Sequence, residues 1–113
     1  MISGTKIKTF TDNIMAFREL VHDEIHPMQM VAFLEVMSTL PLTVSANHLC
    51  ERFGISQASA SRHCRVLTDR AGPNRKGYDI CCWVYEPSDH RTKYLELTEK
   101  GRDLVEILNK RFK

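Results

Sequence analysis

A chain of 113 residues, 42% hydrophobic and 27% charged, has the size and composition of one small globular domain. Its apolar runs are shorter than the roughly 18 to 20 residues that cross a membrane, and a charged-then-apolar signal segment is not found at its N-terminus. We therefore expect a cytoplasmic protein without a membrane partner, whose four cysteines are reduced.

The net charge of +2 is distributed unevenly along the chain. Residues 1–44 carry a net charge of −2, residues 45–76 carry +4, residues 77–97 carry −2 and residues 98–113 carry +2. Solvated basic faces are common in proteins, but a basic central segment also fits a polyanionic partner.

The first two expected elements are helices. Phe10, Ile14, Phe17 and Val21 recur at helical spacing and predict an amphipathic helix over about 9–22. Pro27 suits the first turn of a second helix that continues to about residue 40 and is apolar on most sides, which indicates a central position. The segment "PLTV", residues 41–44, then predicts a short strand.

Residues 45–69 predict a helix-turn-helix. Ser45 and Ser56 are natural N-caps of two short helices, and Gly54 ends the first helix because glycine readily adopts left-handed backbone. A recognition helix contacts base edges mainly with its N-terminal residues, and Gln and Arg side chains pair well with adenine and guanine. We therefore predict base contacts from Gln57, Ser59, Ser61 and Arg62, and phosphate contacts from Ser56, Arg65, Arg75 and Lys76.

A loop, "AGPNRKG", leads into a predicted β-hairpin over residues 78–97, formed by "YDICCWVYE" and "RTKYLEL". Thr98 then caps a last helix with Leu104, Leu108 and Phe112 on one stripe. The expected fold is a single domain over residues 1–113, mainly α with a small β-hairpin (α+β). Its expected architecture is a winged helix-turn-helix with the order α-α-β-α-α-β-β-α.

The stretch "LTVSANHLCERFGISQASASRHCRVLTDRAG", followed by "DHRTKYLELTEKGRDLVEIL", resembles the winged helix-turn-helix of the MarR family of bacterial transcription regulators. The most specific pieces are Asp89 and Arg91 at the wing tip and "LTEKG" after them. The resemblance implies that the recognition helix enters the major groove and that Arg91 reaches the minor groove. It also implies that Asp89 orients Arg91 or braces the hairpin.

The resemblance further implies a homodimer on a pseudo-palindromic operator, with dimerisation helices in residues 1–41 and 98–113. Candidate dimer contacts are Phe10, Ile14, Phe17, Leu104, Leu108 and Phe112. Two departures affect this expectation: residues 72–89 are longer than the usual wing segment, and the sequence has one helix after the wing where the family has a further long helix. Many family members bind small aromatic acids, so an effector is conceivable, although the Met- and Phe-rich second helix is more typical of a core.

Other functions receive less support from the sequence. Neither a glycine-rich phosphate loop nor a nucleophile with a placed base is apparent, so we expect no enzyme and no cofactor. Cys81 and Cys82 are adjacent on a strand and point to opposite faces, which disfavours a zinc site with His90 and leaves a redox role open. A winged-helix module that binds a protein, for example a virus-encoded one that docks on host machinery, and a DNA-binding replication accessory remain the alternatives.

Overall fold

The computed structural model describes residues 3–112, except for the side chain of His90. Its helices and strands are α1 (Gly4–Leu20), α2 (Pro27–Ser38), α3 (Ala46–Phe53), α4 (Gln57–Leu67), β1 (Arg70–Gly72), β2 (Arg75–Lys76), β3 (Cys81–Glu86), β4 (Asp89–Leu97) and α5 (Glu99–Arg111). This confirms a mainly α fold with a β-hairpin wing.

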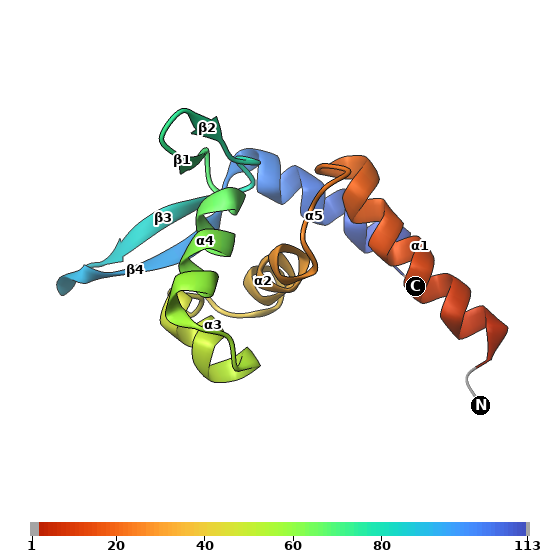
Figure 1. The fold of residues 1–113 in the computed structure, drawn as a ribbon, viewed down its shortest axis with the longest axis horizontal. Coiled ribbons are helices and arrows are strands. Elements are labelled where there is room, and N and C mark those ends of the chain that lie inside the picture. Colours follow the sequence, from red (N-terminus) through yellow and green to blue (C-terminus); the bar gives the residue numbers. More distant parts are fainter. Residues whose placement is uncertain (1–2, 113) are drawn as a thin grey trace.

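The molecule is elongated, with extents of 48 × 28 × 25 Å. Helix α2 lies at the centre, α1 and α5 run beside each other on one side of it, and α3 and α4 lie on the other side (Figure 1). The β3–β4 wing projects from one end, and the N-terminal half of α1 projects from the opposite end (Figure 1). Along residues 3–112, no helix combines the length and apolar character that crossing a membrane requires.

One hydrophobic core joins the helices to the base of the wing. Its largest fully buried side chains include Phe33 from α2, Leu67 from α4, Leu95 from β4 and Leu108 from α5. Burying one such side chain stabilises the fold by about 1.5 to 3 kcal/mol. The central position predicted for the second helix is therefore confirmed.

The predicted helix caps are also confirmed. The hydroxyl oxygens of Ser45, Ser56 and Thr98 each accept a hydrogen bond from a backbone N–H three residues further on, at 3.0, 3.1 and 3.0 Å. Gly54 adopts a φ of 69° at the end of α3, a left-handed conformation that favours glycine. These local signals determine where α3, α4 and α5 begin and where α3 turns toward α4.

Two expected features of the chain order are wrong. The strand expected over residues 41–44 is not formed, because the chain turns at Leu42 with a φ of 60°. One backbone hydrogen bond, from the Leu95 N–H to the Val44 carbonyl at 2.8 Å, joins this segment to the wing, and the Leu42 N–H donates a second hydrogen bond to the Glu96 side chain at 3.2 Å. The expected loop over residues 71–77 instead contains the β1–β2 hairpin, which forms a sheet separate from β3–β4. The first helix also begins earlier than the predicted residue 9 and ends at Leu20.

The C-terminal end of α4 is fixed by the segment that follows β2. The N–H groups of residues 77–80 donate hydrogen bonds of 2.7–3.0 Å to the carbonyls of residues 66–69. These bonds satisfy carbonyls that the end of a helix leaves without intrahelical partners. Gly77 is required at this close approach, since a Cβ atom there would lie 1.9 Å from the Thr68 carbonyl oxygen. The path from α4 to the wing is therefore closely defined.

Candidate nucleic-acid interface

A buried carboxylate positions the helix-turn-helix on the central helix. Glu35 of α2 is only 7% exposed, and its Oε2 accepts hydrogen bonds from His48 Nε2 at 2.7 Å and Arg52 Nε at 2.9 Å. Burial raises the pKa of Glu35, but the hydrogen bonds and charges of His48 and Arg52 outweigh burial and hold the pKa below its ordinary value. The charged Glu35 thus connects α2 to both turns of α3.

Helix α4 has a buried face and an open face. Ala60, Cys64 and Leu67 are fully buried in the core, as their helical spacing predicts. Ala58, Arg62 and Arg65 are exposed on the opposite side. The small Ala58 leaves the first turn of this open face accessible to a close partner.

A groove of about 330 Å³ separates α4 from the wing. Three of its side chains are cationic, several donate or accept hydrogen bonds, and none carries a carboxylate. The lining residues are Ser45, Ala46, Asn47, Gln57, Ser61, Arg65, Trp83, Arg91, Thr92 and Lys93. The groove is therefore suited to a partner that bears negative charge and hydrogen-bonding groups.

The wing presents Arg91 on a braced tip. The Asp89 Oδ1 atom accepts hydrogen bonds from the Arg91 backbone N–H at 3.0 Å and from Arg91 Nε at 3.4 Å, and Oδ2 accepts one from the Thr92 hydroxyl at 3.3 Å. The Arg91 backbone hydrogen bond is the main reason that the pKa of Asp89 lies below its ordinary value. The Arg91 side chain remains 94% exposed, so its guanidinium is accessible to a partner.

The structure brings together four of the residues predicted to contact DNA. Gln57, Ser61 and Arg65 follow one another at intervals of four residues on α4, so they form one row along the groove, which Arg91 closes from the wing. Arg62 lies exposed beside this row.

The other predicted contacts of the helix lie outside that row. The Ser56 oxygen caps α4 by accepting the Ser59 N–H, which leaves its hydroxyl proton free to donate. Ser59 is half-buried and shares a helix row with His63.

His63 packs at the boundary between α4 and α2. Its ring stacks on that of His26, with centroids 4.4 Å apart, and its Nδ1 lies 3.3 Å from Gln29 Nε2. Burial is the main cause that lowers the pKa of His63, followed by the charges of His26 and Arg62. The neutral ring is therefore favoured at this junction.

Sequence reasoning missed several residues of this surface. Lys93 lies in the groove and holds its ammonium 4.4 Å from the centre of the Trp83 ring; its position two residues after Arg91 on one strand placed both on the same face. Asn47 enters the groove from the first turn of α3, where no motif pointed to it. Arg75 and Lys76 do not reach the groove but lie on β2, beside Arg70 of β1, which sequence reasoning also missed.

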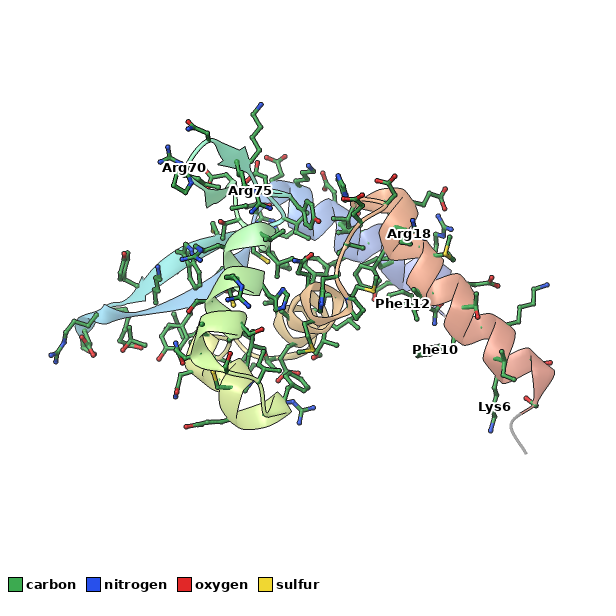
Figure 2. The ribbon with its side chains drawn as sticks, viewed as in Figure 1. Lys6, Phe10, Arg18, Arg70, Arg75 and Phe112 are labelled. Carbon is green, nitrogen blue, oxygen red and sulfur yellow. The ribbon has the colours of Figure 1, made fainter. Side chains whose placement is uncertain are left out.

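The predicted dimer contacts fall into two groups. Phe17, Leu104 and Leu108 are buried in the core of the single chain, so almost none of their side-chain surface is open to a partner, although Phe17 also lines the apolar groove described next. Phe10 is 68% exposed, and with Phe112 it borders an apolar groove of about 380 Å³ between α1, α2 and the end of α5 (Figure 2). Ile14 lies in the same groove.

The adjacent cysteines point to opposite faces of β3, as predicted. Cys81 is fully buried and Cys82 is exposed. Burial raises the pKa of the Cys81 thiol and raises that of Cys64 to about 12, so both thiols stay protonated. The side chain of His90 lies outside the described part of the structure.

Comparison with known proteins supports the fold. No protein-family model and no curated protein matches the chain, but solved structures do. The transcriptional regulator Tm0710 from Thermotoga maritima superposes with a TM-score of 0.68 and 16% identity, over 95% of this chain and 68% of that one. A mutant of MepR from S. aureus gives a TM-score of 0.63 and 16% identity, over 99% and 78% of the two chains.

Two further matches concern the family named from the sequence. BpsR from Bordetella bronchiseptica, whose DNA binding is regulated by 6-hydroxynicotinic acid, has a TM-score of 0.57 and 18% identity, over 98% of this chain and 73% of its own. MarR itself has a TM-score of 0.60 and 18% identity, over 95% and 71%. The resemblance to the MarR family is thus confirmed for the fold, and the chain has the winged-helix architecture of these regulators.

Proposed function

We propose that this protein binds double-stranded DNA and regulates transcription, with α4 in the major groove and the wing at the minor groove. The observation that carries the proposal is the groove between α4 and the wing, whose lining holds Arg65, Arg91 and Lys93 and no carboxylate. DNA offers phosphates and base edges side by side, and both accept hydrogen bonds from these donors. The shared fold of known transcription regulators supports the same conclusion.

The residues divide by role. Arg62 projects from the open face of α4 and is proposed to read a base, together with Gln57, Ser59 and Ser61. Arg65 and the capping Ser56 are proposed to hold phosphates, because Ser56 lies at the start of α4 and Arg65 in its last turn. Arg91, ordered by Asp89, is proposed to enter the minor groove.

A homodimer on a pseudo-palindromic site is part of the proposal. The apolar groove bordered by Phe10, Ile14 and Phe112 supports it, since two copies of this surface would remove exposed apolar area from water. Substituting Phe10 with Ser should shift the protein toward the monomer in sedimentation equilibrium and leave its circular dichroism unchanged. A Phe10→Ser variant that sediments like the wild type would refute this dimer surface.

Selection from a random duplex library at near-physiological salt tests the function. We expect enrichment of an inverted repeat with half-sites about one helical turn apart, and loss of that enrichment in the Arg62→Ala/Arg91→Ala variant. Arg62→Ala alone should weaken binding of the selected duplex by about 1 to 3 kcal/mol and relax one base position. No enrichment by the folded wild type would contradict the proposal and favour a protein-docking module.

A further inference from the structure

The short β1–β2 hairpin is a separate structural unit between α4 and the wing. Its strands pair Arg70 with Lys76 and Gly72 with Arg75, and its Pro73-Asn74 turn has Asn74 at a φ of 59°, which asparagine tolerates. The segment after β2 is bonded to the last carbonyls of α4. The hairpin is therefore held in a defined position at the C-terminal end of α4, where Figure 1 shows it apart from the wing.

The hairpin carries exposed positive charge that forms no ion pair within residues 3–112. Arg70, Arg75 and Lys76 are all exposed, and Asp69 is the only acidic residue in the segment 69–77. Over residues 3–112, the ion pairs formed in the structure involve other side chains. Because the hairpin backbone is already ordered, binding an anion to its three cations costs less conformational entropy than binding to a flexible loop.

The positive surface continues from α4 onto the hairpin. Arg65 lines the groove against the wing, and it also lines a second hollow with Arg70 and Arg75. A third hollow adjoins it, lined by Arg70, Arg75 and Lys76 together with Asp69 and Asn74. Figure 2 shows Arg70 and Arg75 at the hairpin beside the end of α4. One anionic polymer that contacts α4 could thus reach the hairpin without a gap.

The dimensions match a duplex whose backbone passes over the hairpin. Helix α4 has 11 residues and is therefore about 16 Å long, whereas the major groove is about 12 Å wide. An element attached beyond the C-terminal end of α4 would then lie over the phosphates that border the groove. Arginine and lysine side chains there would bind phosphate oxygens without reading the sequence.

We propose that the β1–β2 hairpin is a second backbone clamp, in which Arg70, Arg75 and Lys76 bind DNA phosphates on the side of α4 away from the wing tip. This inference rests on the proposed function and assigns to the hairpin affinity without base specificity. Arg65 connects the clamp to the base-reading surface.

Salt dependence of duplex binding tests the clamp. Fluorescence anisotropy at several salt concentrations would compare the wild type with Arg70→Ala/Arg75→Ala/Lys76→Ala, on the selected duplex and on a random one. The slope of log affinity against log salt is negative, and each lost phosphate contact makes it less steep by about 0.9. The slope of the triple variant should therefore be less steep by about 2 to 3 per chain on both duplexes. The base preference should not change.

Two control variants make the outcome specific. Lys6→Ala/Lys8→Ala/Lys110→Ala removes the same charge from exposed positions on α1 and α5 and should leave the slope unchanged. Arg70→Lys/Arg75→Lys keeps the charge and should keep the slope. Equal slopes for the hairpin variant and the wild type, with Arg62→Ala still weakened, would overturn the clamp alone. A folded wild type that binds neither duplex would overturn the clamp and the proposed function together.

Discussion

Glu35 provides the sharpest test of how this fold holds its helix-turn-helix. The substitution Glu35→Gln keeps the shape of the side chain and removes its charge. The Glu35 carboxylate extends from α2, is buried, and accepts hydrogen bonds from His48 and Arg52 of α3. We expect the variant to fold and to be clearly less stable than the wild type.

The magnitude follows from the two hydrogen bonds and from the exposure of their donors. A hydrogen bond to a charged group contributes about 1.5 to 3 kcal/mol. The side chains of Arg52 and His48 are 57% and 27% exposed, so water can partly replace the lost carboxylate at both donors, and the glutamine oxygen can accept one hydrogen bond. The expected loss in the free energy of unfolding is therefore about 2 kcal/mol rather than the sum of two full contributions.

The effect has a defined dependence on pH. Because the pKa of Glu35 is lower in the folded state than its ordinary value of about 4.5, the folded protein binds fewer protons at this site than the unfolded chain. The stabilisation is fully present above pH 4.5 and is lost as the pH falls through the folded pKa. The difference between wild type and variant should decrease over that acidic range.

Urea unfolding followed by circular dichroism measures this difference. The matched control is Glu51→Gln, whose exposed carboxylate on α3 accepts a single hydrogen bond from Asn47 at 3.3 Å; it should change stability by less than about 0.5 kcal/mol. If Glu35→Gln proved as stable as this control at neutral pH, the reasoning about the buried carboxylate would be wrong.

Further predictions concern single sites. Gly101→Ala places a Cβ 2.0 Å from the Ile80 carbonyl oxygen and should lower the free energy of unfolding by about 3 kcal/mol in urea; an unchanged midpoint would contradict this. The pKa of His63 is lowered in the fold, so the folded protein binds fewer protons at this site than the unfolded chain. The free energy of unfolding should therefore decrease as the pH falls from about 6.5 through the folded pKa. Thermal unfolding of His63→Gln should lack this part of the pH dependence. A thiol reagent should modify Cys82 well before Cys64; equal rates would refute the assigned burial.

The parts of the fold that the sequence predicted depend on short-range chemistry. Ser45, Ser56 and Thr98 mark helix starts because a hydroxyl that caps a helix acts within one turn. Gly54 marks the turn between α3 and α4 for a similar local reason. The spacing of Ala60, Cys64 and Leu67 predicts the buried face of α4, because helical periodicity is itself a local property.

The parts that were missed depend on contacts between distant segments. The strand expected over residues 41–44 has the right composition, but its turn at Leu42 leaves one backbone-to-backbone hydrogen bond to β4. The β1–β2 hairpin is held by the bonds from residues 77–80 to the end of α4, which turn signals alone could not indicate. Leu108 was also misassigned because its contacts come from distant segments. Its apolar helical spacing predicted a buried contact correctly, but the spacing does not distinguish a dimer interface from the core of the same chain.

The most direct test of the central claim is to map backbone amide shifts by NMR when the selected duplex is added. The account predicts the largest changes in residues 57–65 of α4 and 89–93 of the wing tip, with smaller changes at the β1–β2 hairpin and none along the N-terminal half of α1. Changes confined to α1 and α5, or a folded protein whose spectrum does not respond to duplex DNA at low salt, would contradict it.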